Sequence, residues 1–88
     1  MVNDNSLAVE IIYCVPWSYH GVAVWMATEI FAEGGNKVAI KLTPGVSGIL
    51  KVLVSGNVIF DKQKEGNSYP DLTRVKQIRS DIRDRIAR

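Results

Sequence analysis

Hydrophobic and polar positions along the chain follow two periods, one typical of strands and one typical of helices. The segment from about Leu7 to Cys14 is almost continuously apolar, which predicts a central strand buried on both faces. Pro16 suits the first turn of a helix, because its missing N–H would be unpaired there anyway. From about Trp17 to Glu33, apolar residues recur at steps of three and four, which predicts a helix with a broad buried stripe. The stripe comprises Val22, Trp25, Met26, Ile30 and Phe31.

The second half of the chain is predicted to complete a small sheet and to close it with a second helix. Val38–Leu42 is a short strand, and a strand, a helix and another strand fit a crossover with parallel strands. Ile49–Val54 and Val58–Phe60 are expected to pair antiparallel through a turn at 55–57. A polar loop over 62–70 precedes the last helix, which places on one face the residues Leu72, Val75, Ile78, Ile82 and Ile86.

Charged residues at the two ends of the last helix support this boundary. Asp71 lies at its start, and Arg85 and Arg88 lie at its end. Both placements complement the helix dipole.

These elements predict an α+β protein with a minimal thioredoxin-like fold. The expected order is β-α-β-β-α, with a mixed four-stranded sheet and two helices. A chain of 88 residues leaves no room for a second core. We therefore expect a single domain over 7–88 and a short flexible N-terminal segment over 1–6.

Composition and charge exclude several classes of protein. The net charge is only +2, and the basic residues near the C-terminus alternate with acidic ones, which argues against nucleic-acid binding. The first residues do not resemble a signal peptide, and no apolar stretch approaches the length needed to span a bilayer. A single cysteine excludes an intramolecular disulfide and a multi-cysteine zinc site. We expect a cytoplasmic protein with no membrane partner and no bound metal.

The only cysteine, Cys14, lies where the first strand meets the first helix. Thiols at the N-terminus of a helix have a lowered pKa and react as thiolates, because free N–H groups of the helix point at the sulfur. The alternative is a small buried apolar side chain at a strand end, and free cysteine is often buried. The pattern leaves both interpretations open. His20, six residues further on, receives little weight as an activating partner.

Several motifs resemble the selenoprotein W-type (Rdx) family of small thioredoxin-like proteins, over about Val9 to Arg85. They are Val9-Glu10-Ile11-Ile12-Tyr13-Cys14, then Trp25, then Pro44-Gly45-Val46-Ser47-Gly48, and Lys64-Glu65-Gly66 followed by Tyr69-Pro70. The family pattern is Tyr-Cys-x-x-Cys, or selenocysteine at the second position. The resemblance therefore implies a first redox position at Cys14, whereas the second is occupied by Trp17, which cannot perform it. Members are thought to act as thiol-dependent oxidoreductases.

Two functions follow from this resemblance. The first is a one-thiol redox protein, in which Cys14 is the catalytic residue and attacks an oxidised protein partner. An external thiol such as glutathione would resolve the product, and no other cofactor is expected. The second is a redox-inactive protein-binding module that retains the fold. Its candidate surface around the old active site consists of Trp17, Pro44, Gly45, Ser47 and Gly48.

A third hypothesis is a weak homodimer. It would form through an intermolecular Cys14 disulfide or through the edge of the strand Val58–Phe60. The sequence also leaves open whether the Thr43–Pro44 bond is cis or trans.

Overall fold

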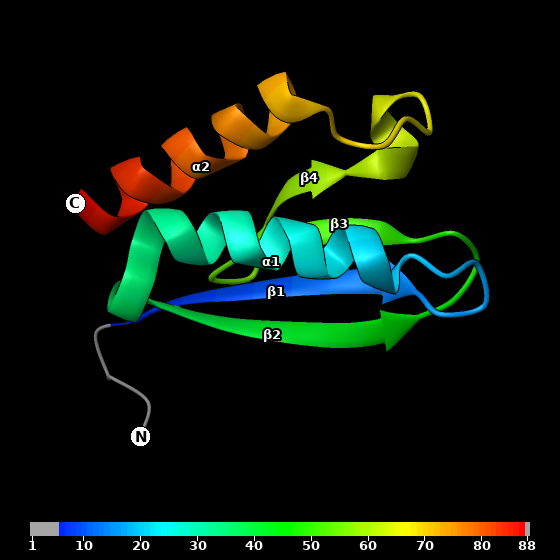
Figure 1. Ribbon diagram of the computed structural model, residues 1–88, viewed down its shortest axis with the longest axis horizontal. Helices are drawn as coiled ribbons and strands as arrows, with labels where there is room; N and C mark the ends of the chain where they lie inside the picture. Colours follow the sequence, from blue (N-terminus) through cyan, green and yellow to red (C-terminus); the bar gives the residue numbers. More distant parts are fainter. Residues whose placement is uncertain (1–5, 88) are drawn as a thin grey trace.

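The first strand lies inside a four-stranded mixed sheet in the computed structural model, which describes residues 6–87 (Figure 1). The strand order is β2-β1-β3-β4. β1 pairs in parallel with β2 on one side and antiparallel with β3 on the other, and β3 pairs antiparallel with β4. The strand bounds are β1 Leu7–Cys14, β2 Val38–Gly45, β3 Leu50–Val54 and β4 Asn57–Asp61.

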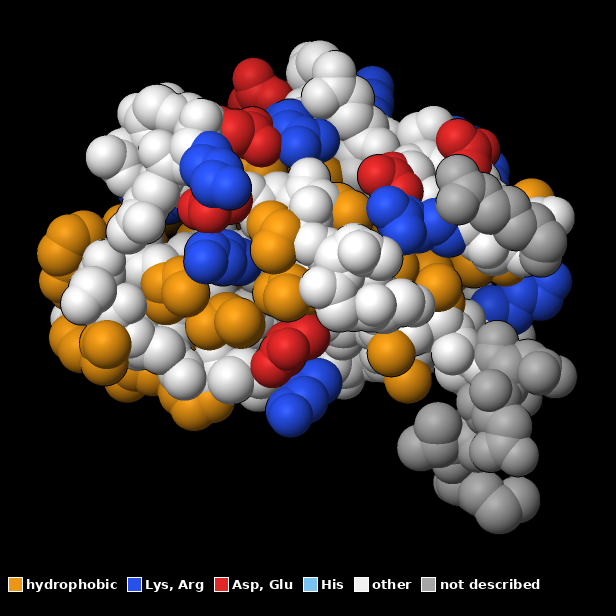
Figure 2. All heavy atoms as spheres, turned by 180° about the vertical axis from the view of Figure 1, so that it is seen from behind, with side chains coloured by type: hydrophobic (Ala, Val, Ile, Leu, Met, Phe, Trp, Pro, Cys, Tyr) orange, Lys and Arg blue, Asp and Glu red, His pale blue; other side chains and the backbone are white. Residues whose placement is uncertain are grey.

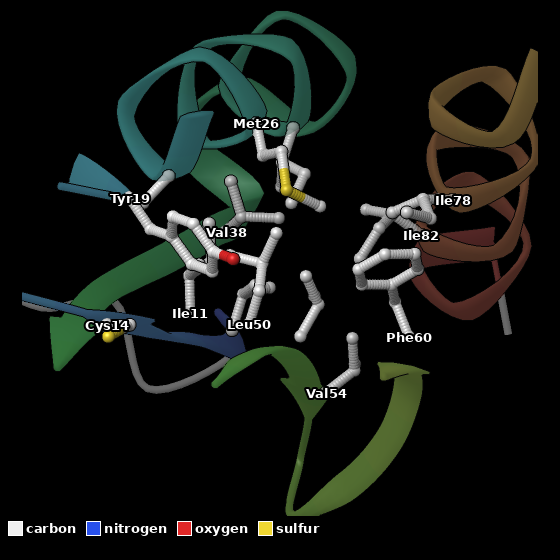
Figure 3. Packing of buried hydrophobic residues seen from close by; sticks show 14 residues of the cluster. Ile11, Cys14, Tyr19, Met26, Val38, Leu50, Val54, Phe60, Ile78 and Ile82 are labelled. Carbon is white, nitrogen blue, oxygen red and sulfur yellow. The ribbon is translucent and has the colours of Figure 1, made fainter. Parts of the chain in front are cut away.

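Two helices cover one face of this sheet and pack against each other (Figures 1 and 3). They are α1, His20–Gly34, and α2, Leu72–Ala87, and two 3₁₀ turns, η1 and η2, cover Gly35–Lys37 and Lys62–Glu65. Arg79 of α2 bridges to Glu29 and Glu33 of α1 through ion pairs of 3.5 Å and 3.2 Å. The charged side chains of α1 are therefore directed towards α2.

The core lies between the two helices and the sheet, where side chains from α1, from α2 and from the strands meet (Figure 3). Alternate residues of β1 and β3 point into it, as the period of two in a strand requires. Its members include Val9, Ile11, Met26, Ile30, Val52, Val54, Phe60, Ile78 and Ile82.

The predicted α+β class, with a mixed four-stranded sheet, two helices and a thioredoxin-like arrangement, is confirmed. The order of elements is β-α-β-β-β-α, so one more strand lies between the helices than in the expected β-α-β-β-α. The predicted parallel crossover and the antiparallel hairpin are both present. Residues 1–5 of the predicted flexible segment 1–6, and Arg88, lie outside the described residues.

The first helix begins at His20 rather than near Trp17. The amide of Ser18 donates to the carbonyl of Val15 at 2.9 Å, so residues 15–18 form a turn with Pro16 at its second position. Ser18 has a φ of 61°, which is incompatible with a right-handed helix. Pro16 fits a turn as well as it fits a first helical turn, and here it serves the turn.

Two residues expected on buried helix faces are exposed. Phe31 is 61% exposed because α1 turns Ala23, Met26, Ile30 and Gly34 towards the core. Leu72 is 66% exposed because α2 buries its interior residues and not its first one. Asp71 precedes α2 and accepts a hydrogen bond from the amide of Arg74, as a capping residue does.

The interior of α2 should carry a large share of the stability. We expect Ile82→Ala to lower the free energy of unfolding by about 2–5 kcal/mol, because Ile82 is fully buried between α2 and the sheet. Leu72→Ala on the same helix is the matched control and should change it by less than about 0.5 kcal/mol. Urea unfolding followed by circular dichroism measures both values. Equal effects would contradict the packing described here.

Candidate functional site

Cys14 is the last residue of β1 and is held by backbone hydrogen bonds on both of its sides. In the sheet it pairs with Gly45 of β2. The next amide, that of Val15, donates to the carbonyl of Gly45 at 3.0 Å, and the carbonyl of Cys14 accepts from the amide of Tyr19 at 3.0 Å. The backbone around the thiol is therefore tied to β2 and to the start of α1.

The side chain of Cys14 is completely buried, with an exposed fraction of 0%. Figure 3 shows its sulfur at the end of β1, pointing away from Tyr19. Apolar side chains close this part of the sheet: a Cβ built on Gly45 would lie 2.7 Å from Ile49 and 3.1 Å from Ile12. An external disulfide therefore has no direct access to this sulfur.

The N-terminus of α1 is not directed at the thiol in the way that the sequence predicts. The helix starts six residues after Cys14, and the amide of Tyr19, just ahead of it, donates to the carbonyl oxygen of Cys14. His20 is exposed on the first turn of the helix.

Trp17, three residues after Cys14, lies on the surface with 60% of its area exposed. Its ring lies over the backbone of Gly48, because a Cβ built there would come within 2.5 Å of the indole. Gly48 also has a φ of 75°, which favours glycine. Two predicted binding residues, Trp17 and Gly48, are thus brought together from different loops.

Two further aromatic rings and one ammonium group continue from Trp17 across this end of the molecule. The ring of Tyr19 makes edge contacts with Trp17 at 6.0 Å and with Tyr69 at 5.3 Å between centroids. The Nζ of Lys62 lies 5.4 Å and 5.3 Å from the centres of the two tyrosine rings. Such cation–π contacts explain how Lys62, only 5% exposed, is accommodated here.

The hydroxyl groups of the two tyrosines in this cluster are also connected. A side-chain hydrogen bond with Tyr19 and, to a lesser extent, partial loss of hydration raise the pKa of Tyr69 above its usual value of 10.0. The charge of Lys62 acts in the opposite direction. Loss of the phenolic proton of Tyr69 is therefore less favourable than in a free tyrosine.

The remaining predicted binding residues are divided between β2 and the loop after it. Pro44 and Gly45 belong to β2, where Pro44 pairs with Tyr13 and is exposed. Ser47 is exposed in the loop 46–49, and its carbonyl accepts a hydrogen bond from Gln63 at 3.4 Å. None of the peptide bonds in the described part of the chain is cis, so the Thr43–Pro44 bond is trans.

These loops form an apolar surface that we call the aromatic tip. Its exposed apolar residues come from the β1–α1 loop, the β2–β3 loop and the segment before α2, and they are Val15, Trp17, Val46 and Tyr69. Figure 2 shows hydrophobic side chains gathered at this end of the molecule, on the left. The sequence indicated Trp17, whereas Lys62 gave no signal because it lies in a loop predicted to be polar.

Two general features complete the description of the site. No group of three or more His, Cys, Asp or Glu residues within 6–87 is arranged to hold a metal ion. Neither helix in the described region is long and apolar enough to cross a membrane.

Comparison with known proteins decides the family. The Rdx family model matches residues 8–84, which is most of the chain. The chain belongs to the Rdx family. This Rdx protein is similar in structure to a selenoprotein W-related protein from Vibrio cholerae, with a TM-score of 0.81 and 23% identity over 93% of this chain and 99% of the other.

A second similar structure is a protein from Bordetella parapertussis. The TM-score is 0.74 and the identity 26%, over 82% of this chain and 91% of the other. No curated protein sequence matches the chain. The family assignment places the chain among thioredoxin-like proteins of redox type.

The contact between Trp17 and Gly48 can be tested by adding one methyl group. Gly48→Ala should displace the indole and change the tryptophan fluorescence spectrum, because the new Cβ would overlap the ring. Gly56→Ala is the matched control: its φ of 83° imposes a similar backbone cost, but nothing lies within 4 Å of its Cβ. A spectrum unchanged by Gly48→Ala would contradict the contact.

The pairing of Tyr69 with Tyr19 predicts a pH dependence. The folded pKa of Tyr69 is raised, so its contribution to stability is present below pH 10.0 and is lost as the pH rises through the folded value. Tyr19→Phe removes the hydrogen bond, and the pKa of Tyr69 should then fall towards 10.0. Ultraviolet titration of tyrosinate, with Tyr13→Phe as the control, measures this change. An identical titration curve for Tyr19→Phe would disprove the hydrogen bond.

Proposed function

We propose that this protein is a thioredoxin-like protein-binding module that captures an apolar segment of a partner on its aromatic tip. The observation that carries the proposal is the contrast between positions 14 and 17. The sulfur of Cys14 is fully buried, whereas Trp17 presents most of its ring to solvent. A nucleophile must be reached by its substrate, and a contact residue must be exposed.

The chemistry of the tip supports an apolar partner. Tryptophan and tyrosine are common among the residues that dominate binding energy, because they bury a large area at a low cost in conformational entropy. Trp17 rests on Gly48 and against Tyr19, and Tyr19 contacts Tyr69, so these rings are held in place before binding. A preorganised surface loses little entropy on binding.

A random peptide library displayed on phage tests this proposal. We expect selected peptides to share aromatic or aliphatic residues, and Trp17→Ala to weaken their binding by about tenfold or more. Phe31→Ala is the control, because Phe31 is an equally exposed aromatic residue on α1. Cys14→Ala should leave binding unchanged, since the sulfur is buried. Peptides whose affinity does not depend on Trp17 would refute the proposal.

A second candidate function is the one-thiol redox protein, and the position of Cys14 favours it. Cys14 lies at the end of β1, beside an exposed turn, in a member of a redox-type family. In this cycle the Cys14 thiolate attacks a partner disulfide, forms a mixed disulfide and expels the other sulfur as a thiolate. A glutathione thiolate then attacks the partner sulfur of the mixed disulfide, forms a new disulfide with it and releases the Cys14 thiolate. Because the sulfur is fully buried, access requires the groups that cover it to move aside.

The same proteins distinguish the two functions. Intact-mass spectrometry after incubation with oxidised glutathione reports a mixed disulfide on Cys14 without reference to peptide binding. The binding proposal expects native protein to remain unmodified over a time in which the urea-unfolded protein reacts fully. Rapid modification of the native protein, together with loss of peptide capture in Cys14→Ala, would favour the redox cycle instead.

A further inference from the structure

We infer that two copies of this chain associate through β2, forming one continuous eight-stranded sheet with the two α1 helices packed together on it. This inference concerns the edge of the sheet and is independent of the aromatic tip. It rests on the free edge of β2, on the apolar hollow beside it, and on the distribution of charge along α1.

The edge of the sheet at β2 is long and regular. β2 pairs with β1 over all eight of its residues, and no strand formed by residues 6–87 lies on its other side (Figure 1). The opposite edge strand, β4, has five residues and an irregular register with β3 between Val52 and Leu53. An uninterrupted edge strand is a template for pairing with another chain, whereas an irregular one is protected.

The backbone groups that face outwards from β2 can be assigned. The carbonyl of Gly45 accepts from Val15, so Gly45 points its backbone groups towards β1. Because these directions alternate along a strand, Val38, Ile40, Leu42 and Pro44 point theirs to the free edge. Pro44 has no N–H to offer, which explains why proline is tolerated in this strand.

One register of two antiparallel β2 strands uses the free edge well. With Ile40 of each copy opposite the other, Val38 lies opposite Leu42 and Ala39 opposite Lys41, and every outward amide has a partner. Centring the pair on Lys41 would place two like charges opposite each other and would set Val38 against Pro44, which lacks a donor.

The hollow beside β2 fits a second copy in particular. It has a volume of about 330 Å³, and its lining comes from α1 and β2: Val24, Ala27, Thr28, Phe31, Ile40 and Leu42. Phe31 and Val24 are among the most exposed apolar residues of the chain. All six lining residues are uncharged.

The expected distance between the two α1 helices of the dimer also agrees with the separation of packed helices. α1 contacts β1 and β2 to the same extent, so it lies over the line between them. Strands are about 4.8 Å apart, which places the two α1 axes two spacings, or about 9.6 Å, from each other. Packed helices are separated by roughly 8–10 Å. The two helices would run antiparallel and place Phe31 of each copy towards the hollow of the other.

The placement of the charged side chains of α1 avoids electrostatic repulsion at this contact. The acidic residues of α1, Glu29 and Glu33, are paired with Arg79 of α2 on the other side of the helix. Lys41 lies on the opposite face of the sheet, in register with Glu10. Two copies can therefore approach through α1 without bringing its acidic residues together, and the two Lys41 side chains, offset by two residues, each lie in register with Glu10 of their own chain.

Sedimentation velocity over a range of concentrations tests the association. We expect a reversible dimer, and Phe31→Glu or Leu42→Glu to raise its dissociation constant by about tenfold or more, because twofold symmetry introduces each charge twice. Val58→Glu is the control, since Val58 is half exposed on β4, the other edge strand. Circular dichroism verifies that each variant is folded. A monomer at all concentrations, or a dimer lost only in Val58→Glu, would overturn the inference.

A cross-link tests the register in a chain that carries Cys14→Ala. Ile40→Cys should form an intermolecular disulfide on mild oxidation, because its Cα atoms would be about 5.5 Å apart. Lys41→Cys should not, because its two copies would be offset by two residues. Efficient cross-linking through Lys41→Cys alone would overturn the register proposed here.

Discussion

Backbone hydrogen bonding on both sides of β1 sets the position of the rest of the molecule. β1 pairs with β2 and β3, so the parallel and antiparallel halves of the sheet are joined only through it. The same bonding continues past its end, where Val15 donates to Gly45 and Cys14 accepts from Tyr19. These bonds decide where α1 can begin, and they hold the thiol where solvent does not reach it.

The sheet could be predicted from the sequence because each strand has its own apolar pattern. Leu7–Cys14 is almost free of polar residues, which predicted a central strand, but the expected burial of both of its faces is wrong: the helices cover one face, so Val9 and Ile11 are buried whereas Ala8 is exposed. The start of α1 could not be predicted in the same way. Pro16 suits both a helical first turn and the second position of a tight turn, and only the left-handed Ser18 decides between them.

Burial was harder to predict than secondary structure. Phe31 continues the apolar period of α1, but the helix is rotated so that smaller residues, Ala23 and Gly34, face the sheet. Lys62 shows the opposite error, since a lysine in a polar loop gives no sign that two tyrosine rings will enclose it. The site was therefore predicted at Trp17 and Gly48, whose contact depends on loop positions, while its extension to Tyr69 required the structure.

The fold and the chemistry of this Rdx protein are separable. The thioredoxin-like arrangement depends on strand pairing and on the core and not on the exposed side chain at position 17. Trp17 lies on a loop, where a change of side chain costs little stability. The same fold can therefore carry different surfaces at this end of the molecule.

Pro44 has a consequence for solubility. Strand edges with unpaired amides allow chains to add one after another, and such growth ends in fibrous aggregates. Pro44 removes the donor at the end of one edge of this sheet, and the irregular register of β4 disturbs the other. In the proposed dimer, pairing of the two β2 strands would leave only β4 strands at the outer edges, so growth beyond two chains would be limited.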